Sequence, residues 1–245
     1  MNLMGEPANV GRHCGSNVYT VDERTVSFYQ EALGDFHPLH ERYAPPLIHH
    51  SECYAHLGQW YLKNLFGNLH GQQDWSMFAP IPIGSKVRTR STIIDRHPKR
   101  GRYWVVNETD LMSAEPGDEG RLLVRGRTYQ SFLPEKKDGE DGLVGDEKSA
   151  AKKLGCPNIV VQAMMSTCFV SQVMQDHFGM GWLEGGRMSV KLTNVLWVDE
   201  TVRAHAKIRN EVTEGTKKRV VCDVWVEKTD GTRVILGEAS AVTGD

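Results

Sequence analysis

Apolar side chains recur at steps of three and four residues across residues 49–66, which predicts an amphipathic helix. Its apolar stripe consists of Tyr54, Leu57, Tyr61 and Leu65. Residues 159–178 form a second predicted helix, which is apolar on almost every side and ends before Gly179. A helix without a polar face is typical of one that a curved sheet encloses.

Runs of β-forming and alternating residues follow each of these helices. In the first half they cover residues 86–95, 103–111 and 122–132, and in the second half residues 187–197, 201–212, 219–228 and 234–242. Turn residues also recur, with Gly84 matching Asp199 and Gly120 matching Gly231. The repeated order predicts an internal duplication and an α+β fold.

Between the two halves, residues 134–153 read PEKKDGEDGLVGDEKSAAKK, in which 11 of the 20 residues are charged. Such a segment has no apolar face to bury, so we expect a solvated linker. The predicted domains are therefore residues 1–133, the linker 134–153, and residues 154–245.

Composition limits the function classes. The chain has 29 basic and 31 acidic side chains, a net charge of -2 that gives no electrostatic reason to expect nucleic acid or an anionic membrane as partner. The sequence contains no apolar run long enough to span a bilayer, and its first residues do not resemble a secretory signal. Five widely spaced cysteines without a CxxC pair are typical of reduced thiols, so we expect a cytoplasmic protein.

The densest group of polar residues precedes the first predicted helix. Asp35 and His40 are five residues apart and flank Pro38, which favours a turn. A carboxylate and an imidazole that meet across such a turn can hold one water for general acid–base catalysis at neutral pH. The alternative is that Asp35 caps the turn and His40 is an ordinary surface histidine.

This segment resembles a known family. Tyr29 and Leu33 followed by Gly34-Asp35-Phe36-His37-Pro38-Leu39-His40 resemble the signature of the MaoC-like, or hydratase 2, enoyl-thioester hydratases, which usually has Asn where this chain has His37. Pro46-Leu47-Ile48-His49-His50 and residues 69–87 are similar to the segments that follow in that family. The likeness covers residues 26–132, whereas residues 186–242 resemble only the body of the fold and lack the Asp/His motif.

The resemblance implies a double hotdog, in which two long helices are each wrapped by a curved antiparallel β-sheet. The N-terminal hotdog would carry the single active site, and the C-terminal hotdog would form a wall of the substrate pocket. Fused hotdogs replace the dimer that separate hotdogs form, although the sheet edges could still pair two chains into a homodimer.

The resemblance also implies roles for individual residues. Asp35 and His40 would activate the water that adds to, or leaves from, a 2-enoyl thioester, giving an R-hydroxyacyl product. The backbone N–H of His50 would stabilise the oxyanion. His37, His49 and Gly58 would contact the substrate, and His37, His50 and Gly58 depart from the family pattern. Coenzyme A or phosphopantetheine would enter as part of the substrate, with no other cofactor and no metal.

Other functions stay open at this point. A hotdog acyl-CoA thioesterase would direct water at the carbonyl carbon instead of the alkene, and a non-catalytic protein would only bind the acyl thioester. Five histidines between residues 37 and 56 suggest a metal site, but the seven-residue step from His49 to His56 separates these two on a helix. A basic cluster could neutralise coenzyme A phosphates or simply form a solvated turn, and consists of Arg96, Lys99, Arg100 and Arg102.

Overall fold

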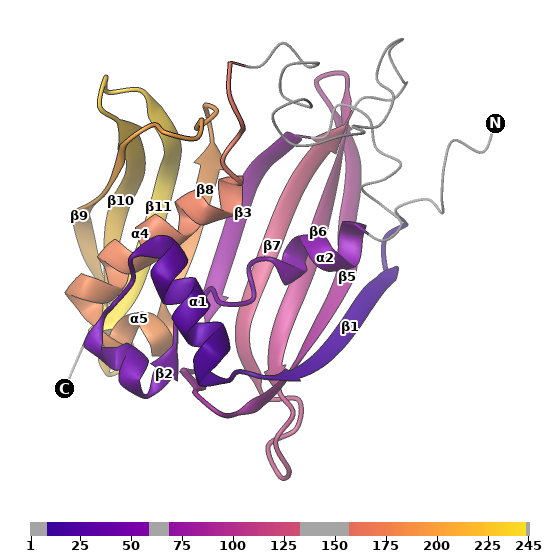
Figure 1. Ribbon diagram of the computed structural model, residues 1–245, viewed down its shortest axis with the longest axis vertical. Coiled ribbons are helices and arrows are strands. Elements are labelled where there is room, and N and C mark those ends of the chain that lie inside the picture. Colours follow the sequence, from indigo (N-terminus) through magenta and orange to yellow (C-terminus); the bar gives the residue numbers. More distant parts are fainter. Residues whose placement is uncertain (1–8, 59–68, 133–156, 244–245) are drawn as a thin grey trace.

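The computed structural model describes residues 9–58, 69–132 and 157–243, and within them a nine-stranded antiparallel sheet dominates (Figure 1). The strand order is β1-β5-β6-β7-β3-β8-β11-β10-β9. The strands of the first half are β1 (His13–Thr20), β3 (Leu69–Met77), β5 (Lys86–Lys99), β6 (Arg102–Ser113) and β7 (Leu122–Phe132). Those of the second half are β8 (Arg187–Leu192), β9 (Val202–Glu214), β10 (Lys217–Lys228) and β11 (Arg233–Thr243).

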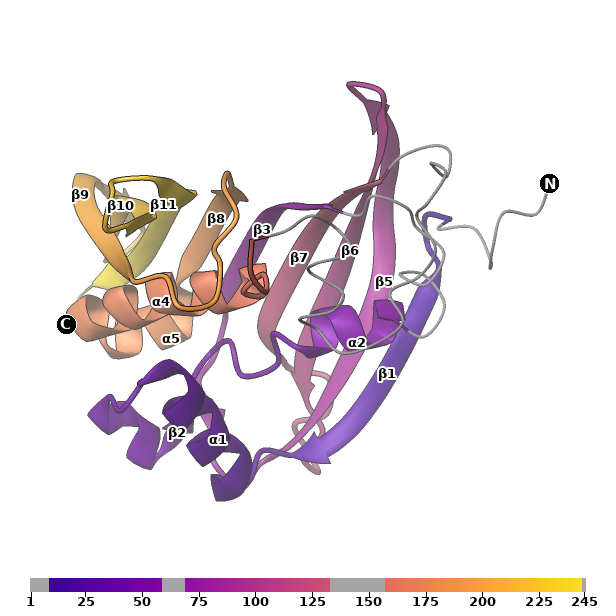
Figure 2. The same ribbon diagram turned by 45° about the horizontal axis from the view of Figure 1, so that its top comes forward.

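The described helices lie on the concave side of this curved sheet (Figure 2). They are α1 (Glu23–Leu33), α2 (Glu52–Gly58), α4 (Ala163–Phe178) and α5 (Met180–Gly185), with a 3-10 helix, η1 (Pro38–Glu41), after α1. Two short strands, β2 (Tyr43–Ala44) and β4 (Ile81–Pro82), pair separately. A large antiparallel sheet that curves around a few helices is the arrangement of a hotdog fold.

The strand order is symmetric about the β3–β8 pair, because β5, β6, β7 and β3 mirror β9, β10, β11 and β8. The matched turn residues also share their backbone conformation. Gly84 and Asp199 have φ of +86° and +72°, and Gly120 and Gly231 both have φ of +83°. These agreements are those expected of a duplicated unit.

The predicted helices differ from the structure at their ends. α4 begins at Ala163 instead of residue 159, because Val160 bridges to Trp197 and the N–H of Val161 donates to Leu196 O at 2.8 Å. In the first half, α2 begins at Glu52, and the predicted helical residues 59–66 lie outside the described residues. Of the two long helices expected, the described residues therefore show one, α4.

The sequence patterns did not predict α1, which places the start of the polar motif. Asp22 caps this helix by accepting from the N–H of Thr25 at 2.7 Å, and Val26 and Tyr29 form its buried face. Gly34 ends the helix with φ of +67°, a left-handed conformation that glycine adopts without strain. The chain then turns directly into Asp35.

One hydrophobic core joins the two halves. Met164 and Met174 on α4 are fully buried, as is Cys53 on α2, so these residues pack in the core. Trp182 is also buried, whereas Trp197 and Trp225 are half-buried. The charged segment 134–153 lies outside the described residues, so the predicted domain boundaries stay predictions.

Candidate active site

Asp35 and His40 are brought together by the turn between α1 and β2. The N–H of Asp35 donates to Gln30 O at 3.0 Å, which continues the end of α1. Pro38 then starts η1, and the His37 ring accepts from the N–H of Leu39 at 3.1 Å and so caps it. One turn of η1 returns His40 to the side of Asp35.

The carboxylate and the imidazole of this pair are in contact and shielded from solvent. Asp35 Oδ1 lies 3.2 Å from His40 Nε2, and the two residues are only 7% and 5% exposed. The alternative of an exposed surface histidine is therefore wrong. His40 Nδ1 lies 2.9 Å from the backbone oxygen of Tyr43, and because a carbonyl can only accept, Nδ1 carries a proton. Proton exchange is left to Nε2, the nitrogen that faces Asp35.

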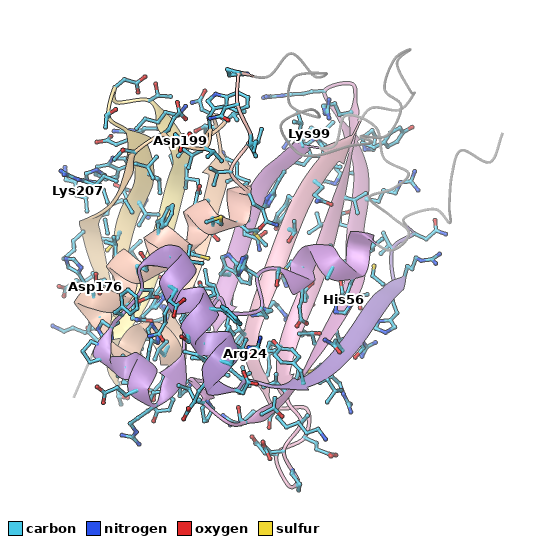
Figure 3. The ribbon with its side chains drawn as sticks, in the orientation of Figure 1. Arg24, His56, Lys99, Asp176, Asp199 and Lys207 are labelled. Atoms are coloured by element: carbon cyan, nitrogen blue, oxygen red, sulfur yellow. The ribbon has the colours of Figure 1, made fainter. Side chains whose placement is uncertain are left out.

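A residue that the sequence patterns missed completes the contacts of His40. Gln175 on α4 is 1% exposed, and its amide nitrogen lies 2.9 Å from His40 Nε2. One turn earlier, Gln172 donates to the backbone oxygen of Leu33 at 3.1 Å. Two glutamines three residues apart on a largely apolar helix are the signal that could have indicated this contact. Figure 3 labels the next residue, Asp176, at the end of α4 that faces α1.

The nearby hydroxyl and thiol groups stay protonated at neutral pH. Burial raises the pKa of Tyr29 well above its usual value, and the neighbouring Cys168 adds to the effect. Burial likewise raises the pKa of Cys168 to about 12. Tyr29 and Cys168, which both interact with Asp35, therefore do not compete for its proton.

His49 and His50 lie in the turn that leads into α2. His49 is fully buried against Trp75, with ring centroids 5.3 Å apart, and neither of its ring nitrogens has a hydrogen-bond partner. Burial, with a smaller contribution from His50, lowers the pKa of His49 to about 3. The pKa of His50 is also lowered by burial, and its ring packs edge-on against Tyr29. Both imidazoles are therefore neutral near pH 7.

The other predicted site residues are placed less favourably. The backbone N–H of His50 donates to Leu47 O at 2.9 Å, so it is not free, and an oxyanion role would require this turn to open. The His37 ring centroid is 6.1 Å from that of His40, but its Nδ1 is used in capping η1. Gly58 ends α2, and the residues after it lie outside the described part of the chain.

Within residues 9–58, 69–132 and 157–243, no three His, Cys, Asp or Glu side chains are grouped so that they could hold a metal ion. His56 lies 3.1 Å from Thr89 Oγ1 and 3.9 Å from Glu52, while His49 lies against Trp75.

None of the described helices is long and apolar enough to cross a membrane. The basic cluster lies on the β5–β6 hairpin, where Lys99 (Figure 3) stacks 5.5 Å above Trp104.

A cavity of about 600 Å³ lies at the opposite end of α4 from Gln175. Its lining is mainly apolar and includes Trp104, Ala163 and Leu196. Ala163 and Gln175 are twelve residues apart, which corresponds to about 18 Å along a helix. The cavity is therefore separate from the acid–base pair.

Comparison with known proteins supports the fold. No family model matches the sequence, and no curated protein matches it either. Solved structures do match. A MaoC-like dehydratase superposes with a TM-score of 0.72 at 13% identity, covering 96% of this chain and 98% of its own. A MaoC-like dehydratase from Phytophthora capsici gives 0.65 at 12% identity, covering 96% and 97%. The 12:0-ACP thioesterase from Umbellularia californica gives 0.57 at 10% identity, covering 94% of each chain. The chain therefore has the hotdog fold of the MaoC-like dehydratases.

Proposed function

We propose that this protein is a hydratase or dehydratase that adds water to, or removes it from, the 2,3 double bond of an acyl thioester. The observation that carries the proposal is the buried contact between Asp35 Oδ1 and His40 Nε2, 3.2 Å apart. In this proposal the chain is a double hotdog that acts on coenzyme A or acyl carrier protein thioesters. The R-hydroxyacyl product, the cytoplasmic location and any homodimer are parts of the proposal that follow from the resemblance of the sequence.

The proposed chemistry needs two proton transfers. In hydration, a water O–H bond breaks as its oxygen bonds to Cβ of the enoyl group, and one member of the pair accepts the proton. The other member, or the same water network, supplies the proton that bonds to Cα. Nδ1 of His40 is hydrogen-bonded to the backbone oxygen of Tyr43. Proton exchange in this proposal therefore takes place at His40 Nε2 and at the Asp35 carboxylate. His49, neutral and adjacent to His50, would contact the substrate.

Thioester hydrolysis is the second candidate, because an acyl-ACP thioesterase shares the fold. The same Asp35 and water would then attack the carbonyl carbon and release the thiol. A panel of 2-enoyl-CoAs separates the two reactions. Hydration consumes the enoyl absorbance without free thiol, whereas hydrolysis releases thiol that a colorimetric reagent detects.

The deciding experiment compares wild type with Asp35→Asn and His40→Ala. We expect both variants to lose about three orders of magnitude in kcat/KM, because general acid–base catalysis is removed. Asp95 and His97 form a matched control, since they make an exposed pair 2.9 Å apart, and Asp95→Asn and His97→Ala should keep full activity. Wild type that binds acyl-CoA but changes neither signal would instead support the non-catalytic binding protein.

A further inference from the structure

The two nitrogens of His40 have different surroundings. Nδ1 is held at 2.9 Å by a backbone carbonyl, and its proton stays in place through any reaction. Nε2 has two neighbours, Asp35 Oδ1 at 3.2 Å and the Gln175 amide at 2.9 Å. These neighbours come from opposite halves of the chain.

The two neighbours suit different protonation states of His40. In the neutral ring, Nε2 has a lone pair that an ionised carboxylate cannot satisfy, but the Gln175 N–H can donate to it. In the protonated ring, Nε2–H donates to Asp35, and the amide of Gln175 can rotate to present its oxygen. A glutamine can therefore serve both states without adding a charge that would fix the proton.

Among the groups near His40, Gln175 is the one suited to hydrogen-bond with both protonation states of the ring. Asp35 and His37 are the titratable groups of the first half that lie next to His40, and Tyr29 and the α4 residue Cys168 interact with Asp35. Tyr29 and Cys168 remain protonated, and the Nδ1 of His37 is used in capping η1. Gln175 is almost fully buried, so water does not compensate for its loss.

We propose that Gln175 is a positioning residue for the acid–base pair, holding His40 Nε2 beside Asp35 and exchanging its N–H for its carbonyl oxygen as the ring gains a proton. This rests on the proposed function. When water transfers its proton to Nε2, an O–H bond breaks and an N–H bond forms, and the Gln175 N–H loses its acceptor. When that proton leaves again, the original hydrogen bond returns. The active site is therefore composite, with α4 of the second half completing the motif of the first.

Two substitutions test the role. Gln175→Met keeps the length of the side chain but removes the amide, and we expect kcat to fall at least tenfold with KM within about twofold. Gln175→Glu offers only acceptors, which favours the protonated ring. The acidic limb of the kcat/KM profile should then move up by about one pH unit or more.

Gln172→Met is the matched control, because Gln172 also joins α4 to the first half but contacts Leu33 O and not His40. It should remove a contact between the halves and leave the pH profile unchanged. If all three variants share the wild-type profile after correction for the folded fraction, Gln175 is merely structural and the proposal is overturned.

A readout without turnover keeps the two proposals distinguishable. The ¹⁵N shifts of the His40 ring report its tautomer and the midpoint of its titration. The midpoint should rise in Gln175→Glu and change in Gln175→Met, but stay in Gln172→Met. Equal shifts in all proteins would refute the role of Gln175. Changed shifts without turnover of any enoyl-CoA would support the Gln175 contact and contradict the hydratase assignment.

Discussion

His49 illustrates how far a single residue can depart from its ordinary chemistry. It is fully buried against Trp75, and both ring nitrogens lack a partner. A buried imidazole without a counter-charge is stable only as the neutral ring, which is why its pKa is lowered to about 3. In the unfolded chain the same ring titrates near pH 6.5.

This difference predicts a pH dependence of stability. Below pH 6.5 the unfolded chain binds a proton at His49 that the folded protein does not, so stability falls as the pH is lowered toward 3. The slope from this residue is at most about 1.4 kcal/mol per pH unit. Urea unfolding of wild type and His49→Met at pH 7.5, 6 and 5 should show a smaller loss in the variant.

His97, which is partly exposed, is the control, and His97→Ala should lose stability with pH as wild type does. Burial also lowers the pKa of His70, to about 4, so His70 makes stability fall as the pH is lowered too. This contribution is the same in wild type and in both variants, and it cancels when their pH dependences are compared. A pH-independent difference between wild type and His49→Met would contradict the lowered pKa.

The sequence predicted that Asp35 and His40 meet, but it did not predict that Gln175 contacts His40. Asp35 and His40 were found because five residues of spacing around a proline have a local consequence, and that consequence is the turn observed. The contact with Gln175 joins residues 135 positions apart, and only the packing of α4 against α1 produces it. The spacing of Gln172 and Gln175 marks a polar side of α4, but a local pattern does not show which distant residue that side meets.

Among the strands, the two halves share a topology but differ in the side chains that they bury. In the first half, polar side chains run across the concave face of the sheet, where Ser91 pairs with Thr109 and Asn107 with Thr128. All four are buried. The matching strand of the second half, β10, buries the alternate residues Val220, Cys222, Val224 and Val226. The first half therefore depends on hydrogen bonds where the second depends on apolar packing.

Asn107 is the centre of this polar network. It accepts from Ser91 Oγ at 2.8 Å, and its amide lies 3.2 Å from Thr109 Oγ1 and 3.5 Å from the backbone oxygen of Cys53 on α2. Asn107→Ala would leave these buried groups without a partner, so we expect a loss of about 2 kcal/mol in the free energy of urea unfolding.

The exposed Asn210 on β9 provides the comparison, and Asn210→Ala should change stability by less than about 0.5 kcal/mol. An equally small effect of Asn107→Ala would mean that the polar band does not stabilise the sheet. The strands of this band were predicted from alternation and from β-forming residues. The start of α4 was not, because the β-branched residues 160 and 161 pair with residues 196–197 instead of continuing the helix.

At the scale of the whole molecule, the halves are joined by more than the chain. β3 and β8 are hydrogen-bonded neighbours, with Asp74 opposite Ser189, and Ser189 Oγ donates to Asp74 at 2.7 Å. Trp75 of β3 donates to Thr167 of α4 at 3.3 Å within the common core. The repeated pattern predicted two similar halves, but the edges at which they meet depend on tertiary pairing.

This junction predicts how fragments behave. Residues 1–133 alone would expose the β3 edge and the core face that covers α4, and residues 154–245 alone would expose the β8 edge. We therefore expect each fragment alone to aggregate or remain unfolded. Expressed together, they should co-purify in a 1:1 complex through a tag on one fragment and show the circular dichroism spectrum of the intact chain.

The same complex tests whether the proposed catalytic centre is composite. Asp35 and His40 would come from one fragment and Gln175 from the other. The complex of the two fragments should therefore lose activity when the 154–245 fragment carries Gln175→Met. That fragment contains no part of the Asp/His motif. A 1–133 fragment that folds cooperatively alone and turns over substrate would contradict both the shared core and the composite site. Since the contacts between the halves extend from β3–β8 to α1–α4, we expect neither fragment to be active alone.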